Sequence, residues 1–138
     1  MTETLEITAW FAAAGDREPD LRSMDAAIRE YAPSLMRGLA GAMLGYGLIE
    51  YRPRSAKVTT QLPVLSLAAQ KRHLSLYACA VVDGEYLAER YRDRLGRVSV
   101  GRSCIRFTHF DRVDADGLAT MLRDLEVRYA RGDSLYGV

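Results

Sequence analysis

The sequence predicts an α+β fold in which helices pack on an antiparallel sheet. Apolar residues recur at helical spacing near both ends, while the middle of the chain alternates apolar and polar residues as strands do. Two alternating segments, 62–70 and 72–82, are separated by so few residues that an antiparallel hairpin is favoured. A length of 138 residues suits one hydrophobic core, so we expect a single domain over residues 1–138.

Two helices are expected before the sheet. The first covers 4–14, where apolar residues follow the three-four spacing of one helical face. The second begins at Asp20 or Ser23, and its apolar spacing continues as far as Leu39. Pro33 lies inside this pattern and should kink or divide the helix, because proline cannot donate a backbone hydrogen bond.

The rest of the chain is expected to complete the sheet and add two more helices. Strands are expected over 43–52, 62–70 and 72–82, then as one interrupted strand or two short ones over 98–100 and 103–107. One helix between strands is expected from Asp83-Gly84 through Leu95. The C-terminal helix is capped by Asp111 or Asp114 and ends at Gly132, and the tail 133–138 is expected to be loose.

Overall charge argues against two classes of partner. The net charge is +1, so global electrostatics indicate neither nucleic acid nor an anionic membrane surface. The first residues lack the basic and apolar regions of a signal peptide, and no run of residues is apolar enough for a transmembrane helix. With only two cysteines and no export signal, a cytoplasmic protein with free thiols is expected.

The polar face of the predicted sheet is the main candidate site. If the strands neighbour each other in register, one concave surface would be lined by Tyr46, Glu50, His73, Tyr77 and Arg106. An imidazole, a carboxylate, a guanidinium and two phenols are suited to holding a small anionic molecule. Two other interpretations stay open: these groups satisfy one another, or the face forms a homodimer contact.

Metal binding and catalysis have weaker support. His73, Cys79, Cys104 and His109 show none of the spacings typical of zinc sites, so no metal ligands are assigned. Cys79 lies six residues from His73 on the same strand, which is too far for direct contact. The sequence therefore predicts no catalytic residues and no enzyme activity.

Three short motifs resemble a known family. The run Lys71-Arg72-His73, the strand that ends at Tyr77, and the later run from Gly101 to Phe107 occur in an order similar to that of the YdhG-like domain. This bacterial family has largely unknown function, and the similarity is best over 42–122. Some of its members are described as frataxin-like iron chaperones. The resemblance therefore implies iron as an alternative cofactor, held by His73 with carboxylates such as Glu50 or Glu85.

Three functions follow as expectations. The first is a non-enzymatic module that binds a small anionic ligand without a cofactor, with Arg106 as the charge partner. The second, which the resemblance implies, is intracellular iron or metal handling. The third is a homodimeric or partner-binding protein whose polar sheet face is the contact surface.

Overall fold

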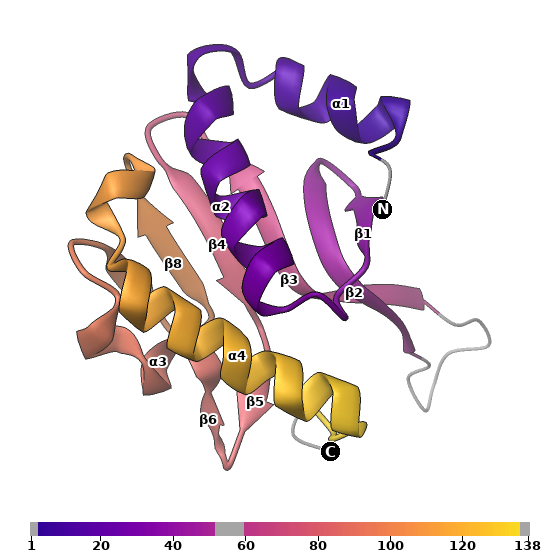
Figure 1. Cartoon of the computed structure of the whole chain (residues 1–138), viewed down its shortest axis with the longest axis vertical. Coiled ribbons are helices and arrows are strands. Elements are labelled where there is room, and N and C mark those ends of the chain that lie inside the picture. The colour runs from indigo at the N-terminus through magenta and orange to yellow at the C-terminus, as the bar shows by residue number, and fades with distance from the viewer. Residues whose placement is uncertain (1–2, 52–59, 136–138) are drawn as a thin grey trace.

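An antiparallel sheet of six strands forms the centre of the fold, in the order β1-β2-β3-β4-β8-β7 (Figure 1). The computed structural model describes residues 3–51 and 60–135. The sheet contains β1 (Arg37–Ala40), β2 (Met43–Tyr51), β3 (Thr60–Ala69), β4 (Leu74–Ala78), β7 (Ser99–Gly101) and β8 (Cys104–Phe107). A separate short hairpin pairs β5 (Val81–Val82) with β6 (Glu85–Tyr86).

The long helices lie on one face of this sheet. Figure 1 shows α2 (Glu18–Tyr31) and α4 (Ala115–Arg131) in front of the strands, with α1 (Leu5–Ala12) beyond the N-terminal end of α2. Short helical turns connect the other elements, namely η1 (Gly15–Arg17), α3 (Leu87–Arg90), η2 (Arg92–Arg94) and η3 (Phe110–Arg112). Among the described residues, no helix has the length and apolar character that crossing a bilayer requires.

Local sequence signals explain where the helices start and stop. The side chain of Thr4 accepts a hydrogen bond from the amide of Ile7 and so caps α1. Asp114 caps α4 in the same way by accepting from the amide of Asp116. Gly132 ends α4 with a φ of 84°, a left-handed conformation that glycine adopts without strain.

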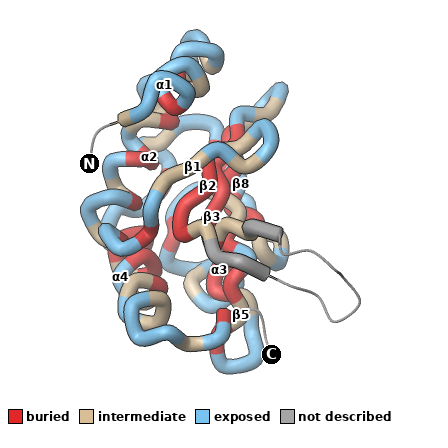
Figure 2. Tube along the Cα trace, turned by 90° about the vertical axis from the view of Figure 1, so that its right-hand side faces the viewer, coloured by how far each residue is buried: buried red, intermediate tan, exposed pale blue. Residues whose placement is uncertain are grey.

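The core fills the space between the helices and the sheet. Aliphatic side chains from alternate positions of β2, β3, β4 and β8 are fully or almost fully buried there, and Figure 2 shows buried residues along the central strands and on α4. Opposite them lie Leu21, Met24 and Ile28 of α2, and Leu118, Met121, Leu122 and Leu125 of α4. The expected α+β architecture is therefore confirmed, with helices packed on an antiparallel sheet.

The second helix is shorter than its apolar spacing predicts. It ends at Tyr31, just before Pro33, and the residues that would have continued it form β1 instead. Ala32 has already left the helical conformation. The ring of Pro33 disfavours helical geometry for the residue before it, and Pro33 has no backbone N–H with which to continue the helix. Arg37–Ala40 pairs with Met43–Tyr46 as a hairpin, and Gly41 in its turn has a φ of 62°.

The prediction of a helix from Asp83 to Leu95 is also wrong in its first part. Asp83 and Gly84 have φ values of 50° and 82°, so they form the tight turn of the β5–β6 hairpin. Asp-Gly is a favoured pair for such turns, because both central residues need positive φ. Helical structure follows only at α3 and η2.

Other sequence-based expectations are confirmed or amended. The first and last helices, the β3–β4 hairpin, and the two short strands β7 and β8 lie close to their predicted positions. The strand expected over 72–82 is too long, because β4 ends at Ala78 and Val81–Val82 forms β5 of the separate hairpin. The tail that was expected to be loose packs against the rest of the protein as far as Leu135. The Leu135 side chain is only 4% exposed, and its carbonyl accepts a hydrogen bond of 2.7 Å from the amide of Val81. Residues 136–138 lie outside the described residues.

Candidate functional site

The register of the sheet brings Tyr77 and Arg106 to the face turned away from α2 and α4. Tyr77 lies opposite Ser66 and Cys104, while Arg106 lies opposite Ser75. The intervening positions of the same strands carry the buried aliphatic side chains of the core. Because side chains alternate along a strand, Tyr77 and Arg106 share the other face, which we call the open face.

Three of the five predicted site residues come together on the open face. His73, Tyr77 and Arg106 line one shallow hollow of about 460 Å³. His73 and Arg106 also line an adjoining hollow of about 530 Å³. The two hollows share Arg72 as well, so they form one continuous basic site, which we call the open-face site.

The other two predicted residues do not join them. Tyr46 pairs with Leu65, which in turn pairs with Ala78, so Tyr46 belongs to the row of core residues. Its side chain is completely buried on the helix side. The expectation that Tyr46 shares a surface with Tyr77 is therefore wrong. The backbone of Glu50 pairs with Gln61, but the side chain of Glu50 lies outside the described residues.

Local structure explains how each cation reaches the open-face site. Arg72 lies in the β3–β4 turn, which is closed by a hydrogen bond of 2.9 Å from the Gln70 amide to the His73 carbonyl. Arg97 follows Gly96, where a Cβ would lie 2.5 Å from the carbonyl oxygen of Arg112. Only glycine allows that approach, so Gly96 brings the chain beside the segment before α4 and directs it to the site.

Arg106 reaches along the open face over a glycine. A Cβ on Gly101 would lie 3.3 Å from Nη1 of Arg106, so the guanidinium occupies the space that a side chain on the neighbouring strand would fill. Arg106 itself is exposed. It can therefore offer the edge of its planar guanidinium to a bound group.

A hydrogen-bond chain fixes the phenol of Tyr77. The amide nitrogen of Gln70 donates to the Tyr77 hydroxyl at 3.0 Å, and the hydroxyl of the buried Ser75 donates to the Gln70 side-chain oxygen at 2.5 Å. Because the Tyr77 hydroxyl accepts from Gln70, its own proton is left to be donated elsewhere. The neighbouring hollow is where an acceptor could take it.

The charge at this site is unbalanced. Arg72, Arg97 and Arg106 line the larger hollow, and Lys71 joins the smaller one, but no carboxylate lines either. Within residues 3–51 and 60–135, none of these four cations forms an ion pair. The local surface is therefore positive although the whole chain is almost neutral.

Arg17 supports the site from the side of the helices. Its Nη1 donates to the carbonyl of Gln70 and, at 3.0 Å, to that of His73, while Nη2 donates to Lys71 at 2.7 Å. One guanidinium thus binds three carbonyls of the turn that carries Arg72. Sequence reasoning missed Arg17, because more than 50 residues separate it from its partners.

Other residues of the site were also missed. Arg72 belongs to a basic motif that the sequence shows, but its place at the site depends on the turn geometry. Apart from its position near a strand end, nothing in the sequence indicates that Gln70 belongs to this site. Nothing places Arg97 there either, because Gly96 and the backbone before α4 determine where Arg97 lies.

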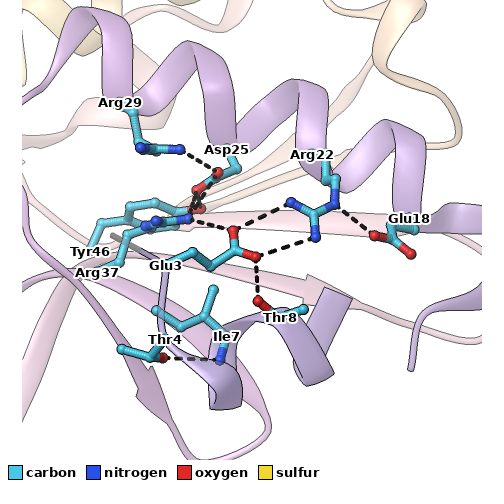
Figure 3. Close-up of polar contacts among 10 residues, drawn as sticks. All are labelled: Glu3, Thr4, Ile7, Thr8, Glu18, Arg22, Asp25, Arg29, Arg37 and Tyr46. Atoms are coloured by element: carbon cyan, nitrogen blue, oxygen red, sulfur yellow. Dashed lines mark hydrogen bonds and ion pairs between the residues drawn. The ribbon is translucent and has the colours of Figure 1, made fainter. Parts of the chain in front are cut away.

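A second polar cluster lies between α2 and β2 (Figure 3). The Tyr46 hydroxyl donates to Asp25 at 2.8 Å, and Nη1 of Arg37 contacts the same carboxylate at 3.2 Å. Arg37 also reaches Glu3, at 3.4 Å, and Glu3 in turn contacts Arg22 at 3.3 Å. Burial, followed by the negative charge of Asp25, raises the pKa of Tyr46 well above its usual value.

The candidate metal ligands do not gather into a site. Cys79 is exposed, Cys104 is buried, and His109 lies 3.2 Å from Asp20 at an exposed position. In the part of the chain that the structure describes, no three His, Cys, Asp or Glu side chains are placed to hold a metal ion together. The geometry thus adds no support for the iron-handling alternative.

Comparisons of the chain with protein-family models, with curated proteins and with solved structures find no match. The resemblance to YdhG-like domains therefore stays a prediction.

Proposed function

We propose that this protein is a non-catalytic binding module for a small anionic ligand, held at the open-face site. The observation that carries the proposal is the group of cations without carboxylate partners around one hollow. Eight other arginines of the described chain pair with carboxylates, and Arg17 is occupied by backbone carbonyls. Arg94, Arg102 and Arg123 form no ion pair in the described chain either, but they line neither hollow. Leaving several cations unpaired on one surface costs electrostatic repulsion, which a bound anion would relieve.

The residues have complementary roles in this proposal. Arg106 offers a planar pair of donors to a carboxylate or phosphate group, and Arg72 and Arg97 add charge from two other segments. Tyr77 donates its hydroxyl proton because Gln70 occupies its acceptor side. Val98 gives the larger hollow an apolar wall against which the uncharged part of a ligand can lie.

The test is thermal unfolding of the purified protein with phosphate, sulfate, nucleotides and small carboxylates, followed by calorimetry on any compound that raises Tm. A ligand present at 100 times its Kd adds about 2.7 kcal/mol of stability. Ferrous iron under anaerobic conditions belongs in the same panel. A Tm rise with iron alone would favour the iron-handling alternative over the anion site.

Variants locate the binding. Arg106→Ala should weaken binding of the active anion at least about tenfold, because a charge-assisted bidentate contact is lost. Arg106→Lys should recover only part of the affinity, since lysine keeps the charge but not the planar pair of donors. Arg131→Ala is the matched control, because Arg131 pairs with Asp133 at the end of α4, away from the site.

The proposal fails if no anion raises Tm, or if Arg106→Ala and Arg131→Ala bind equally well. Arg106 is exposed, so loss of its side chain should leave the fold intact and make either result readable. If no anion binds, the mass of the protein in solution at several concentrations tests the interaction-protein alternative.

A further inference from the structure

A separate hollow lies on the helix side of the molecule, away from the open face. It has a volume of about 520 Å³ and lies between the start of α1, the second half of α2 and the segment that enters β1. We propose that this hollow binds a zwitterion of the apolar α-amino acid class. The carboxylate would contact Arg37 and Arg29, the ammonium would contact Glu30, and the apolar side chain would contact Ile7, Leu35 and Met36.

Arg37 is the anchor of this proposed site. Its side chain is only 8% exposed, and Nη1 alone makes all of its contacts, with Asp25 and Glu3. Its Nε and Nη2 make no hydrogen bond within the described chain, yet no buried polar side-chain atom there lacks a partner. These two nitrogens are therefore not completely enclosed, and Arg37 lines the hollow.

Asp25 holds a second guanidinium at the same wall. Nη1 of Arg29 lies 3.7 Å from Asp25, one turn along α2, and the remaining nitrogens of Arg29 are free of hydrogen bonds in the described structure. Figure 3 shows Arg29 and Arg37 reaching Asp25 from two different elements. A buried carboxylate that orients two arginines prepares them to receive another carboxylate with little loss of side-chain freedom.

The charge around the hollow favours a zwitterion over a simple anion. Asp25 and Glu3 already offset part of the positive charge of Arg37. Glu30 also lines the hollow and forms no ion pair within residues 3–51 and 60–135. A plain carboxylate would be repelled by Glu30, whereas an α-amino acid carries a cation next to its carboxylate.

Apart from Thr4, the rest of the lining is apolar. Ile7 and Leu35 form the inner wall, and Met36 is 49% exposed at the opening. A branched aliphatic side chain placed there would cover Met36, whose flexible thioether adapts to different shapes. Burying such a side chain favours binding by the hydrophobic effect, which is why the proposal specifies apolar amino acids.

Calorimetry with three related compounds tests the proposal. Leucine carries all three groups, isocaproate lacks the ammonium, and isoamylamine lacks the carboxylate. Leucine should bind, and each analogue should bind at least about tenfold more weakly, because each leaves one charged partner unpaired. Failure of leucine to bind at millimolar concentration, or equal binding of all three compounds, would overturn the proposal.

Variants assign the binding to this hollow. Glu30→Gln should weaken leucine binding about tenfold and leave isocaproate binding unchanged or tighter, because only leucine has an ammonium group. Glu30 is exposed, so this variant should fold. Arg37→Lys should reduce binding of both compounds, and Arg131→Ala is the control. If Glu30→Gln and Arg131→Ala bind leucine equally, the proposal is wrong, even if Arg37→Lys proves too unstable to purify.

Discussion

The hydroxyl of Tyr46 donates a hydrogen bond of 2.8 Å to Asp25, and both side chains are almost completely buried. This contact joins β2 to α2 across the core. It also compensates part of the cost of burying the Asp25 carboxylate, which Arg37 and Arg29 offset further. Tyr46 thus stabilises the helix–sheet interface instead of lining the open face.

Tyr46→Phe should lower the free energy of unfolding by about 2 kcal/mol at neutral pH. The ring still fills its place in the core, but Asp25 loses a donor that nothing else in the cluster replaces. Urea unfolding followed by circular dichroism measures the difference. Tyr31→Phe is the matched control, because Tyr31 is only partly buried and its hydroxyl makes no hydrogen bond in the described chain. A cost no greater than that of the control would show that the contact contributes nothing.

The same substitution should change how stability depends on alkaline pH. The pKa of Tyr46 is raised well above its usual 10 in the folded protein, mainly by burial, whereas the unfolded chain ionises it near 10. A raised pKa contributes stability that is complete below pH 10 and is lost as pH rises above it. The wild type should therefore lose its advantage over Tyr46→Phe above pH 10. A difference that stays constant across that range would contradict the assignment.

Asp124 should make an opposite, acid-dependent contribution. Burial opposes its ionisation, but hydrogen bonds from Tyr91 at 2.6 Å and Arg128 at 2.7 Å outweigh burial and lower the pKa of Asp124 below its usual 3.8. A lowered pKa contributes stability above the unfolded value that is lost as pH falls through the folded one. Asp124→Asn should therefore cost about 2 kcal/mol at pH 7.

This cost should shrink as the pH falls below 3.8. The measurement is urea unfolding of both proteins at a series of pH values. Asp111→Asn is the control, because the carboxylate of Asp111 is 85% exposed and its one ion pair, to Arg112, is 3.9 Å long. If Asp124→Asn and this control had the same pH profile, the buried contacts would not be the cause.

Gly117→Ala should be among the most destabilising single substitutions in the chain. A Cβ there would lie 1.6 Å from the carbonyl oxygen of Arg94, which belongs to the backbone of η2 and cannot turn aside. We expect a loss of about 3 kcal/mol or more, because α4 must shift away from η2. Gly132→Ala is the comparison: nothing lies within 4 Å of its Cβ, so only its positive φ should cost about 1–2 kcal/mol. Equal losses in chemical denaturation would refute this steric argument.

Strand alternation was enough to predict part of the open-face site. Alternation places Tyr77 and Arg106 on exposed faces of their own strands, and the β4–β8 register brings those faces together. Alternation alone wrongly places Tyr46 on the same face, because the pattern within one strand does not say which side meets the helices. Its pairing with Leu65 and its partner Asp25 decide that, and both lie about 20 residues away in sequence.

Turn chemistry explains the larger errors in the secondary structure. Apolar residues around Leu39 fit helical spacing, but they equally suit a strand once Pro33 has ended the helix and Gly41 has allowed a tight turn. Asp83-Gly84 has the composition of a hairpin turn as well as of a helix start. In both places, a glycine with positive φ selects the hairpin over the helix.

Arg17→Met should weaken the open-face site without removing any residue that lines it. The three carbonyls that Arg17 binds belong to the turn that carries Arg72 and His73, so their loss should let that turn move. Hydrogen exchange of the Gln70 amide, which bonds to the His73 carbonyl, should become faster. Affinity for the anion that binds the wild type should fall several-fold, since the cations are no longer held in position.

Arg17→Lys should restore little of this affinity, because an ammonium cannot reach all three carbonyls in the planar arrangement of a guanidinium. If Arg17→Met, compared with Arg131→Met, neither lowers the affinity for the anion nor speeds exchange of the Gln70 amide, the turn holds its shape unaided and Arg17 has no positioning role.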